Sequence, residues 1–145
     1  MPEVKFYDSI DDSFLKFAVI VAKCKDKWVL SKHKERNTYE IPGGHRDAGE
    51  DIITTAKREL FEETGADDYA LTPICVYSVT GKNNVIDNDT ETFGMLYFAE
   101  IKSFDKLPDF EMEKVFLFDE LPTQLTYPLI QPRLVAKVNS VMFGR

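Results

Sequence analysis

Short apolar runs separated by polar turns recur along the chain, and they predict a protein rich in β-strands. Residues 17–23 and 71–80 are rich in Val and Ile, a composition typical of buried strands. The polar residues 25–27 predict a turn into a second strand at 28–30, so that the strands on either side of this turn form a hairpin. Further strands are predicted at 39–41, 92–101 and 114–118.

The polar segments suggest how these strands are connected. The loop 81–89 separates two strand-like runs and predicts a long hairpin, and a turn is expected at 105–109 around Pro108. Residues 1–16 mix charged with aromatic positions and predict a loosely structured start that can include a short strand.

Helical spacing of apolar residues occurs in two places. Ile52, Ala56 and Leu60 recur every four residues, which predicts a helix over 51–64 with this stripe facing the core. Gly65 is well placed to end that helix. A second helix is predicted over 129–141. Strands before and after the first helix, followed by a terminal helix, predict an α/β architecture with a mixed sheet.

The first helix carries a dense cluster of carboxylates. Glu59, Glu62 and Glu63 stand at positions i, i+3 and i+4, so their side chains emerge on one face of the helix. Three like charges this close repel one another, and folding does not require them. Because Mg²⁺ prefers oxygen ligands and commonly bridges carboxylates to phosphates, the cluster indicates a metal site. The alternative is a solvated helix face.

These glutamates belong to a longer pattern: a glycine, five residues, Glu, seven residues, Arg-Glu, an apolar residue, any residue, Glu-Glu, any residue, Gly and an apolar residue. In this chain the positions are Gly44, Glu50, Arg58, Glu59, Leu60, Glu62, Glu63, Gly65 and Ala66. The pattern resembles the signature, or box, of the Nudix hydrolases; Ala66, smaller than the usual aliphatic residue, is a soft departure. Such a coincidence has a chance frequency on the order of 10⁻⁸ to 10⁻⁹ per window, so a solvated face explains the glutamates poorly.

The resemblance implies a fold and a reaction. The fold is a Nudix-type α/β/α sandwich with a mixed β-sheet and two main helices. The family hydrolyses a nucleoside diphosphate joined to another group X: water attacks phosphorus while metal ions neutralise the phosphate oxygens and help to deprotonate the water. By the resemblance, Mg²⁺ or Mn²⁺ is held by Glu59, Glu62, Glu63 and the backbone carbonyl of Gly43.

The resemblance also implies supporting residues and a general base. Arg58 would orient the carboxylates by ion pairing, and Glu50 would support the loop that begins at Gly44 through hydrogen bonds. The base would be one of the three metal-binding glutamates or a Glu outside the box. Glu111 and Glu113 lie where some members carry an additional metal-binding or catalytic Glu, and the alternative is that both are exposed loop charges.

The segment ahead of the box lines the substrate pocket in such folds. Arg36 is a candidate contact for phosphate, and Tyr39 for a base or sugar; the competing interpretation is an ordinary polar loop. His45 occupies an unconstrained box position and is expected to be a surface residue rather than a base. Trp28 and Phe93 could stack on a nucleobase, although aromatic residues in strands are more often part of the core.

The box indicates the reaction class and leaves the group X open. Patterns typical of the coenzyme A branch are absent, and Pro73 lies too close to the box for the proline of the ADP-ribose branch. The chain resembles the MutT-like branch, which predicts a pyrophosphohydrolase that releases nucleoside monophosphate and pyrophosphate from nucleoside triphosphates such as 8-oxo-dGTP. The alternatives are another nucleoside diphosphate-X (a dinucleoside polyphosphate, capped RNA or ADP-ribose) and a non-catalytic nucleotide-binding Nudix sensor.

Length, charge and cysteine content narrow the remaining classes. The 145 residues suit a single domain over 1–145, and the net charge of −7 argues against general nucleic-acid binding. No apolar run is long enough to span a bilayer and the N-terminus lacks a signal-peptide layout, so a cytoplasmic protein is expected. Cys24 and Cys75 are expected to be buried free thiols. The family often dimerises, so a homodimer is possible.

Overall fold

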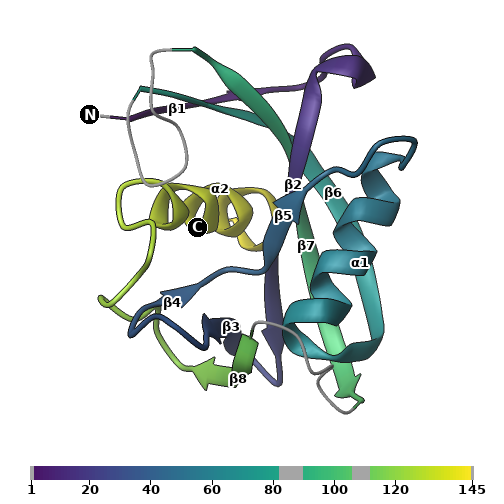
Figure 1. Cartoon of the computed structure of the whole chain (residues 1–145). Coiled ribbons are helices and arrows are strands. Elements are labelled where there is room, and N and C mark those ends of the chain that lie inside the picture. The colour runs from purple at the N-terminus through teal and green to yellow at the C-terminus, as the bar shows by residue number, and fades with distance from the viewer. Residues whose placement is uncertain (1, 82–89, 106–111, 145) are drawn as a thin grey trace.

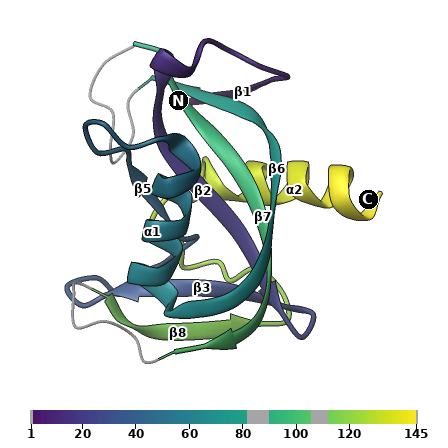
Figure 2. The ribbon, with the colours of Figure 1, turned by 90° about the vertical axis from the view of Figure 1, so that its right-hand side faces the viewer.

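The structure is a computed structural model that describes residues 2–81, 90–105 and 112–144, and within these ranges eight strands form one sheet. The strands are β1 (Glu3–Tyr7), β2 (Leu15–Cys24), β3 (Lys27–His33), β4 (Tyr39–Glu40), β5 (Gly43–His45), β6 (Ala66–Thr80), β7 (Thr92–Phe104) and β8 (Met112–Phe118). The helices are the short 3₁₀ helix η1 (Asp12–Phe14), α1 (Ile52–Thr64) and α2 (Gln131–Phe143). Figures 1 and 2 show α1 and α2 on opposite sides of the sheet, which confirms the expected sandwich.

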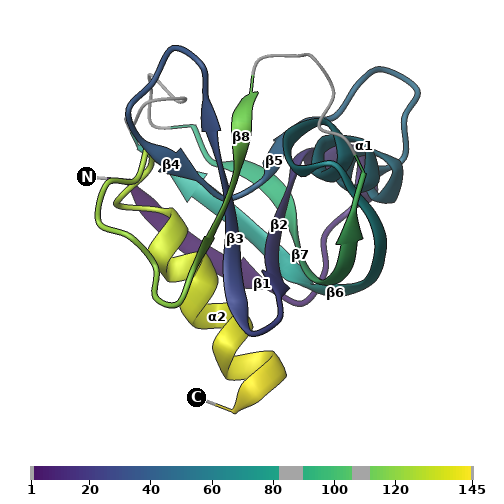
Figure 3. The ribbon, with the colours of Figure 1, turned by 90° about the horizontal axis from the view of Figure 1, so that it is seen from below.

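The sheet is mixed, as predicted. Neighbouring strands follow the order β1-β6-β7-β2-β3-β4, with β5 paired to β2 and β8 paired to β3. β2 and β7 are parallel, whereas β8 runs antiparallel alongside β3 (Figure 3). Parallel strands need a long connection between them. The chain between β2 and β7 includes the box loop and α1, so this connection carries the candidate site.

The two faces of the sheet bury different side chains, because successive residues of a strand point to opposite faces. On β2, Ile20 packs on the α1 side together with Ala56 and Leu60, and all three are fully buried. The next residue, Val21, packs on the α2 side with Leu134. The predicted core-facing stripe of the first helix is therefore confirmed at Ala56 and Leu60.

The predicted hairpin between the first two core strands is confirmed by the antiparallel pairing of β2 with β3. Lys25 and Asp26 have φ angles of 53° and 65°, the left-handed conformation that two-residue hairpin turns use. Five strands (β2, β3, β6, β7 and β8) are longer than predicted. The two largest extensions are in β3, which continues to His33, and in β6, which begins at Ala66. Both extensions are paired, with β8 and with the far end of β7.

The start of the chain is more regular than its composition predicts. β1 is the expected short strand, but it pairs with β6 along its whole length, and Val4 lies opposite Val79. Val4 is only 4% exposed. The expected short strand is therefore confirmed at Glu3–Tyr7. Pairing with a strand far along the chain makes this segment more ordered than its composition predicts.

The second helix lies two residues further along the chain than predicted. It has a proline in its first turn, where the missing N–H is tolerated, and Gly144 ends it in the left-handed conformation with a φ of 68°. Both signals are local, and they describe the ends of α2 better than the apolar spacing does.

Other predictions concern the cysteines and the connecting loops. Cys24 and Cys75 are buried and free, as expected. Within the described ranges, no helix is both long and apolar enough to cross a membrane. The predicted loop at 81–89 and turn at 105–109 lie, apart from their first residues, outside the described part of the chain.

Candidate active site

Helix α1 is held at both ends by local capping. Asp51, predicted inside the helix, is instead its N-cap, and its side chain accepts a hydrogen bond from Thr54 N at 2.9 Å. Gly65 ends the helix as predicted, with a φ of 75° and its N–H donating to Phe61 O at 2.8 Å. Between these ends, the last two turns of α1 bring Glu59 and Glu63 against β5.

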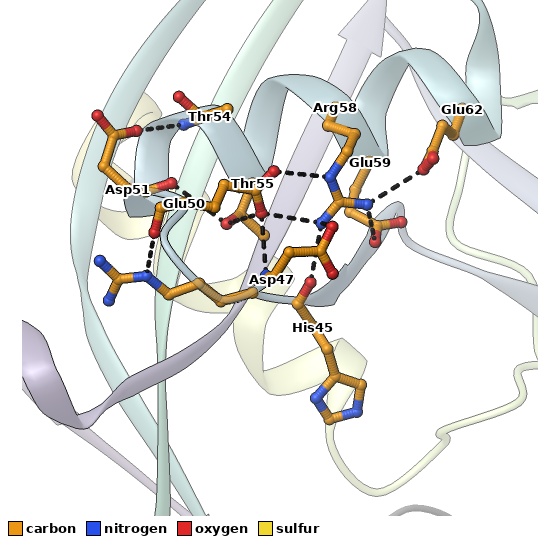
Figure 4. A network of polar contacts seen from close by, with 10 residues as sticks. His45, Asp47, Glu50, Asp51, Thr54, Thr55, Arg58, Glu59 and Glu62 are labelled. Atoms are coloured by element: carbon orange, nitrogen blue, oxygen red, sulfur yellow. Dashed lines mark hydrogen bonds and ion pairs between the residues drawn. The ribbon is translucent and has the colours of Figure 1, made fainter.

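Arg58 is the centre of a polar network that joins α1 to the box loop (Figure 4). Its Nε and Nη2 atoms donate to both carboxylate oxygens of Glu50, at 2.8 and 3.0 Å. Its Nη1 atom donates to Glu59 at 3.0 Å and to Glu62 at 3.1 Å. Nη2 also donates to the backbone carbonyl of His45 at 3.0 Å. One planar cation therefore sets the orientation of three carboxylates and of the loop.

Glu50 lies where the sequence predicts a loop-supporting carboxylate. Besides Arg58, it accepts hydrogen bonds from Thr55 Oγ1 at 2.7 Å and from Asp47 N at 3.1 Å. These bonds, those from Arg58 first, lower the pKa of Glu50 to about 2. The Glu50 backbone carbonyl in turn accepts from Arg46 Nε at 2.6 Å. Glu50 is thus a stable anion that ties the loop to the helix.

Glu59 and Glu63 are in a different electrostatic environment from Glu50. Glu63 Oε1 accepts a hydrogen bond from Gly43 N at 3.1 Å. Burial raises the pKa of both carboxyl groups above the ordinary value, and the negative charge of Glu59 raises that of Glu63 further. The ionised form of this pair is therefore disfavoured by the fold, and a nearby cation would offset that penalty.

Gly44 allows the helix and β5 to approach closely. A Cβ atom at this position would overlap the carboxylate group of Glu59. At Gly43 a Cβ would come within 2.6 Å of the Ala18 carbonyl oxygen on β2. Gly43 and Gly44 are therefore both needed for space: Gly44 accommodates the glutamate, and Gly43 accommodates the neighbouring strand.

Replacing Gly44 with Ala is expected to lower kcat by about 10- to 100-fold, because the methyl group displaces the Glu59 carboxylate by roughly 1 Å. The stability loss should be small, since the end of a side chain can move. Gly49→Ala is the matched control: Gly49 has a φ of 77° but no atom within 4 Å of an added Cβ, so this variant should lose stability and keep its kcat. Steady-state kinetics with thermal unfolding tests this, and equal kcat values for both variants would contradict it.

The side chains of this region fit a hard divalent cation. Glu59, Glu62 and Glu63 offer the carboxylate oxygens that Mg²⁺ and Mn²⁺ favour, and a cation would relieve the disfavoured ionisation of Glu59 and Glu63. Among the described residues, the carboxylates do not yet form a ready-made group of three metal-ligating side chains. Glu59 and Glu62 turn to Arg58, and Glu63 turns to Gly43. Joint binding of a cation therefore requires side-chain rotation on a helix already in place.

A pocket of about 170 Å³ opens beside these carboxylates. Its wall is formed by residues of β2, β4, β5 and β6, the first turn of α2 and the segment before that helix, and these residues are mostly apolar or aromatic. They are Phe17, Val19, Glu40, Ile41, Gly43, Gly44, His45, Tyr77, Val79, Tyr127, Ile130, Gln131 and Leu134. Gly43 and Gly44 belong both to this wall and to the contacts with Glu63 and Glu59, so the pocket and the carboxylate cluster share strand β5.

Two polar residues of this wall are missed by the sequence analysis. Glu40 pairs with Arg36 at 3.0 Å, and its side chain is only 13% exposed. Gln131 is 5% exposed, and its Oε1 accepts a hydrogen bond from Ile41 N at 3.0 Å. The sequence does contain an indication for Gln131. It begins the buried face of α2 that continues at Leu134, and a polar residue on an otherwise apolar helix face indicates a polar partner or a functional role. Glu40 has no comparable signal.

The sequence model of the NUDIX domain matches residues 14–137 of this chain. The chain belongs to the Nudix family. It is a Nudix hydrolase, a pyrophosphohydrolase acting on phosphorus-containing anhydrides, and this family works on small nucleotide substrates with a divalent metal ion.

Several relatives support this assignment. The Bacillus subtilis protein named "Putative 8-oxo-dGTP diphosphatase YtkD" is 34% identical over 125 residues, which cover 86% of this chain and 75% of that protein. The crystal structure of a variant of the Bacillus subtilis pyrophosphohydrolase BsRppH is similar with a TM-score of 0.78 and 27% identity, and the match covers 98% of this chain and 92% of that one. A C. elegans Ap4A hydrolase shares the fold, with a TM-score of 0.68, 18% identity, and coverage of 90% and 100%.

Arg36 and Tyr39, predicted ahead of the Nudix box, do not line the pocket beside the box. Arg36 is exposed and pairs with Glu40, and it lines a separate shallow hollow rather than the pocket beside the box. Tyr39 packs its ring edge-on against Phe116 and Phe118, with ring centroids at 4.9 and 5.0 Å, and it is not among the residues of the pocket wall. A substrate contact by either residue stays a prediction.

The remaining candidates of this Nudix chain are also located. His45 is exposed, and Figure 4 shows its ring pointing away from the Arg58 network. Trp28 is buried in the core on the α2 side, as aromatic strand residues usually are. Glu113 belongs to β8 at the level of its backbone, and Glu111 lies outside the described residues. A role for either residue stays a prediction.

Proposed function

We propose that this Nudix hydrolase is a Mg²⁺-dependent nucleoside triphosphate pyrophosphohydrolase that releases nucleoside monophosphate and pyrophosphate, with 8-oxo-dGTP or a related deoxynucleotide as substrate. The observation that carries the proposal is the shared strand β5, which joins an apolar pocket to a carboxylate cluster. A volume of about 170 Å³ suits one flat ring system, whereas whole drug-sized ligands fill pockets of roughly 300 to 1,000 Å³. A base in the pocket would direct the phosphates over Gly43 and Gly44 towards α1.

The proposed ligands of Mg²⁺, or of Mn²⁺ in its place, are Glu59, Glu62 and Glu63 with the Gly43 carbonyl. When bound, the metal would supply charge neutralisation at the phosphate oxygens and a water of lowered pKa. The support for this set is the crowding of Glu59 and Glu63, whose ionised forms are disfavoured without a cation.

The other box residues are proposed to hold this arrangement in place. Arg58 keeps Glu59 and Glu62 within 3.1 Å of one guanidinium nitrogen, which restricts where their oxygens can move. Glu50 holds Arg58 from the opposite side through two hydrogen bonds. The proton of the attacking water would be taken by a box glutamate or by a Glu outside the box. The buried free thiols are consistent with the proposed cytoplasmic location.

Turnover of a substrate panel tests the proposal. With Mg²⁺ present, we expect pyrophosphate rather than orthophosphate from deoxynucleoside triphosphates, including 8-oxo-dGTP, and no product after chelation of the metal. The panel includes diadenosine polyphosphates, 5′-capped RNA and ADP-ribose. Preferential hydrolysis of one of these would replace the triphosphate assignment. Tight nucleotide binding without any product would identify a sensor instead of an enzyme.

A further inference from the structure

Gln131 offers a hydrogen-bond donor to the pocket. Its side-chain oxygen accepts from the Ile41 backbone N–H at 3.0 Å. Because a backbone N–H can only donate, this bond determines which end of the carboxamide is oxygen and which is nitrogen. The –NH₂ group of Gln131 therefore points away from Ile41, and within the described part of the chain it has no protein partner.

The donor group of Gln131 is not fully buried, and Gln131 lines the pocket. Among the described residues, the fully buried side-chain polar atom without a partner is Ser31 Oγ, so the Gln131 nitrogen is not sealed in the protein interior. Gln131 as a whole is only 5% exposed and lines the pocket wall. The bond from Ile41 to the side-chain oxygen fixes the orientation of the amide. Its unpaired –NH₂ group in a mostly apolar wall is therefore suited to donate a hydrogen bond to an acceptor atom of a ligand.

Glu40 supplies an acceptor to the same wall. It directly precedes Ile41, whose backbone N–H is bonded to Gln131, and both Glu40 and Gln131 line the pocket. One of its carboxylate oxygens is held by Arg36 Nη1 at 3.0 Å. A carboxylate has about four lone-pair positions, and so Glu40 keeps acceptor capacity for a ligand.

We propose that Gln131 and Glu40 select a 6-oxopurine base in this pocket, a proposal that rests on the proposed nucleotide function. The Gln131 –NH₂ donates to the O6 carbonyl oxygen, and Glu40 accepts from the N1–H and the 2-amino group. Adenine would present its 6-amino donor to the Gln131 donor, and thymine would place its O2 oxygen against the carboxylate. The recognised groups form the Watson–Crick edge of the base, which is the same in guanine and 8-oxoguanine, so both bases fit.

The test compares substrates that differ along the Watson–Crick edge of the base, within each enzyme variant. kcat/KM is measured for dGTP, for dITP, which lacks the 2-amino group, and for 2-aminopurine deoxyriboside triphosphate, which lacks O6 and therefore also the N1–H. The wild type should prefer dGTP over the 2-aminopurine substrate by at least about 10-fold. Gln131→Met should lower that ratio several-fold and leave the part that comes from the N1–H, which Glu40 accepts. Glu40→Gln should reduce the preference for dGTP over dITP. Because each ratio is taken within one variant, a structural effect that changes kcat/KM equally for both substrates does not change the ratio.

Each outcome decides between specific alternatives. An unchanged dGTP to 2-aminopurine ratio in Gln131→Met would overturn the role of Gln131. A uniform fall of kcat on every substrate in Glu40→Gln would overturn its role in base selection and indicate a role near Glu63. If Gln131→Met does not fold, Glu40→Gln still tests the pair.

A binding measurement distinguishes a failure of this inference from a failure of the proposed function. Calorimetric titration with GMP and AMP needs no turnover. A preference for GMP that disappears in Gln131→Met would support the pocket assignment even if no triphosphate were hydrolysed. Equal binding of GMP and AMP by an enzyme that hydrolyses triphosphates would reject the inference and leave the proposed function standing.

Discussion

A Glu62→Gln variant is expected to lose kcat by on the order of 10³-fold or more while it remains folded. The proposed role of Glu62 is to bind the metal, and an amide oxygen is a weaker, uncharged ligand for a hard cation. Its described contact is one ion pair with Arg58 at 3.1 Å, and its side chain is 29% exposed. Such a partly exposed pair contributes only about 0.2 to 1 kcal/mol to stability, so the free energy of unfolding should hardly change.

The measurement is steady-state kinetics with Mg²⁺ on the best substrate of the panel, together with thermal unfolding of the same preparations. Glu120→Gln is the matched control, because Glu120 is exposed and lies far along the chain from the box. It loses the same charge and should retain wild-type kcat. Near-wild-type turnover in Glu62→Gln would remove Glu62 from the proposed metal site.

A Glu63→Gln variant is expected to be inactive to a similar degree, yet more stable than the wild type without metal at neutral pH. Burial and the neighbouring Glu59 raise the pKa of Glu63 in the folded state. The folded protein therefore binds this proton more tightly than the unfolded chain does. From an unfolded pKa near 4.5, stability falls as the pH rises through the folded pKa. Glutamine carries no such charge, and it can still accept the hydrogen bond from Gly43 N.

Melting temperatures measured between pH 5 and 8 in the presence of a chelator test this predicted direction of the pH dependence. The advantage of Glu63→Gln over the wild type should widen as the pH rises. Added Mg²⁺ should raise the melting temperature of the wild type by mass action and that of Glu63→Gln much less. A variant that is less stable than the wild type at pH 8 in chelator would refute the electrostatic account. Glu120→Gln again controls for the change in net charge.

The carboxylates of this site differ in what they contribute to stability. Glu50 and Arg58 form an ion pair that strengthens the loop. The ionised forms of Glu59 and Glu63 are disfavoured by burial, and a bound cation would offset this cost. Functional groups that conflict with stability in this way are common at catalytic sites.

Much of the candidate site was predictable from sequence because its information is local. The spacing of Glu59, Glu62 and Glu63 on one helix follows from 3.6 residues per turn. The end of α1 at Gly65 follows from capping chemistry, and the predicted core stripe was correct at Ala56 and Leu60. Each of these features depends on residues within a few positions of one another.

The extent of the sheet was less predictable, because its strand ends depend on distant partners. β1 is ordered by pairing with β6, in which Glu3 lies opposite Thr80 and Tyr7 opposite Val76. β6 starts earlier than its apolar run because β7 continues beside it. In both cases the extra residues have mixed composition, and hydrogen bonding to a neighbour determines their conformation rather than hydrophobic burial.

The sequence by itself determined the family, the box and the helix that carries the glutamates. The tertiary structure alone decided which residues from distant segments form the pocket beside the box. The bond between Ile41 and Gln131 joins residues 90 positions apart, and the neighbourhood of Glu40 and Gln131 in one pocket wall depends on how α2 packs on the sheet. Such contacts result from the packing of elements that lie far apart along the chain. No local pattern of residues encodes them.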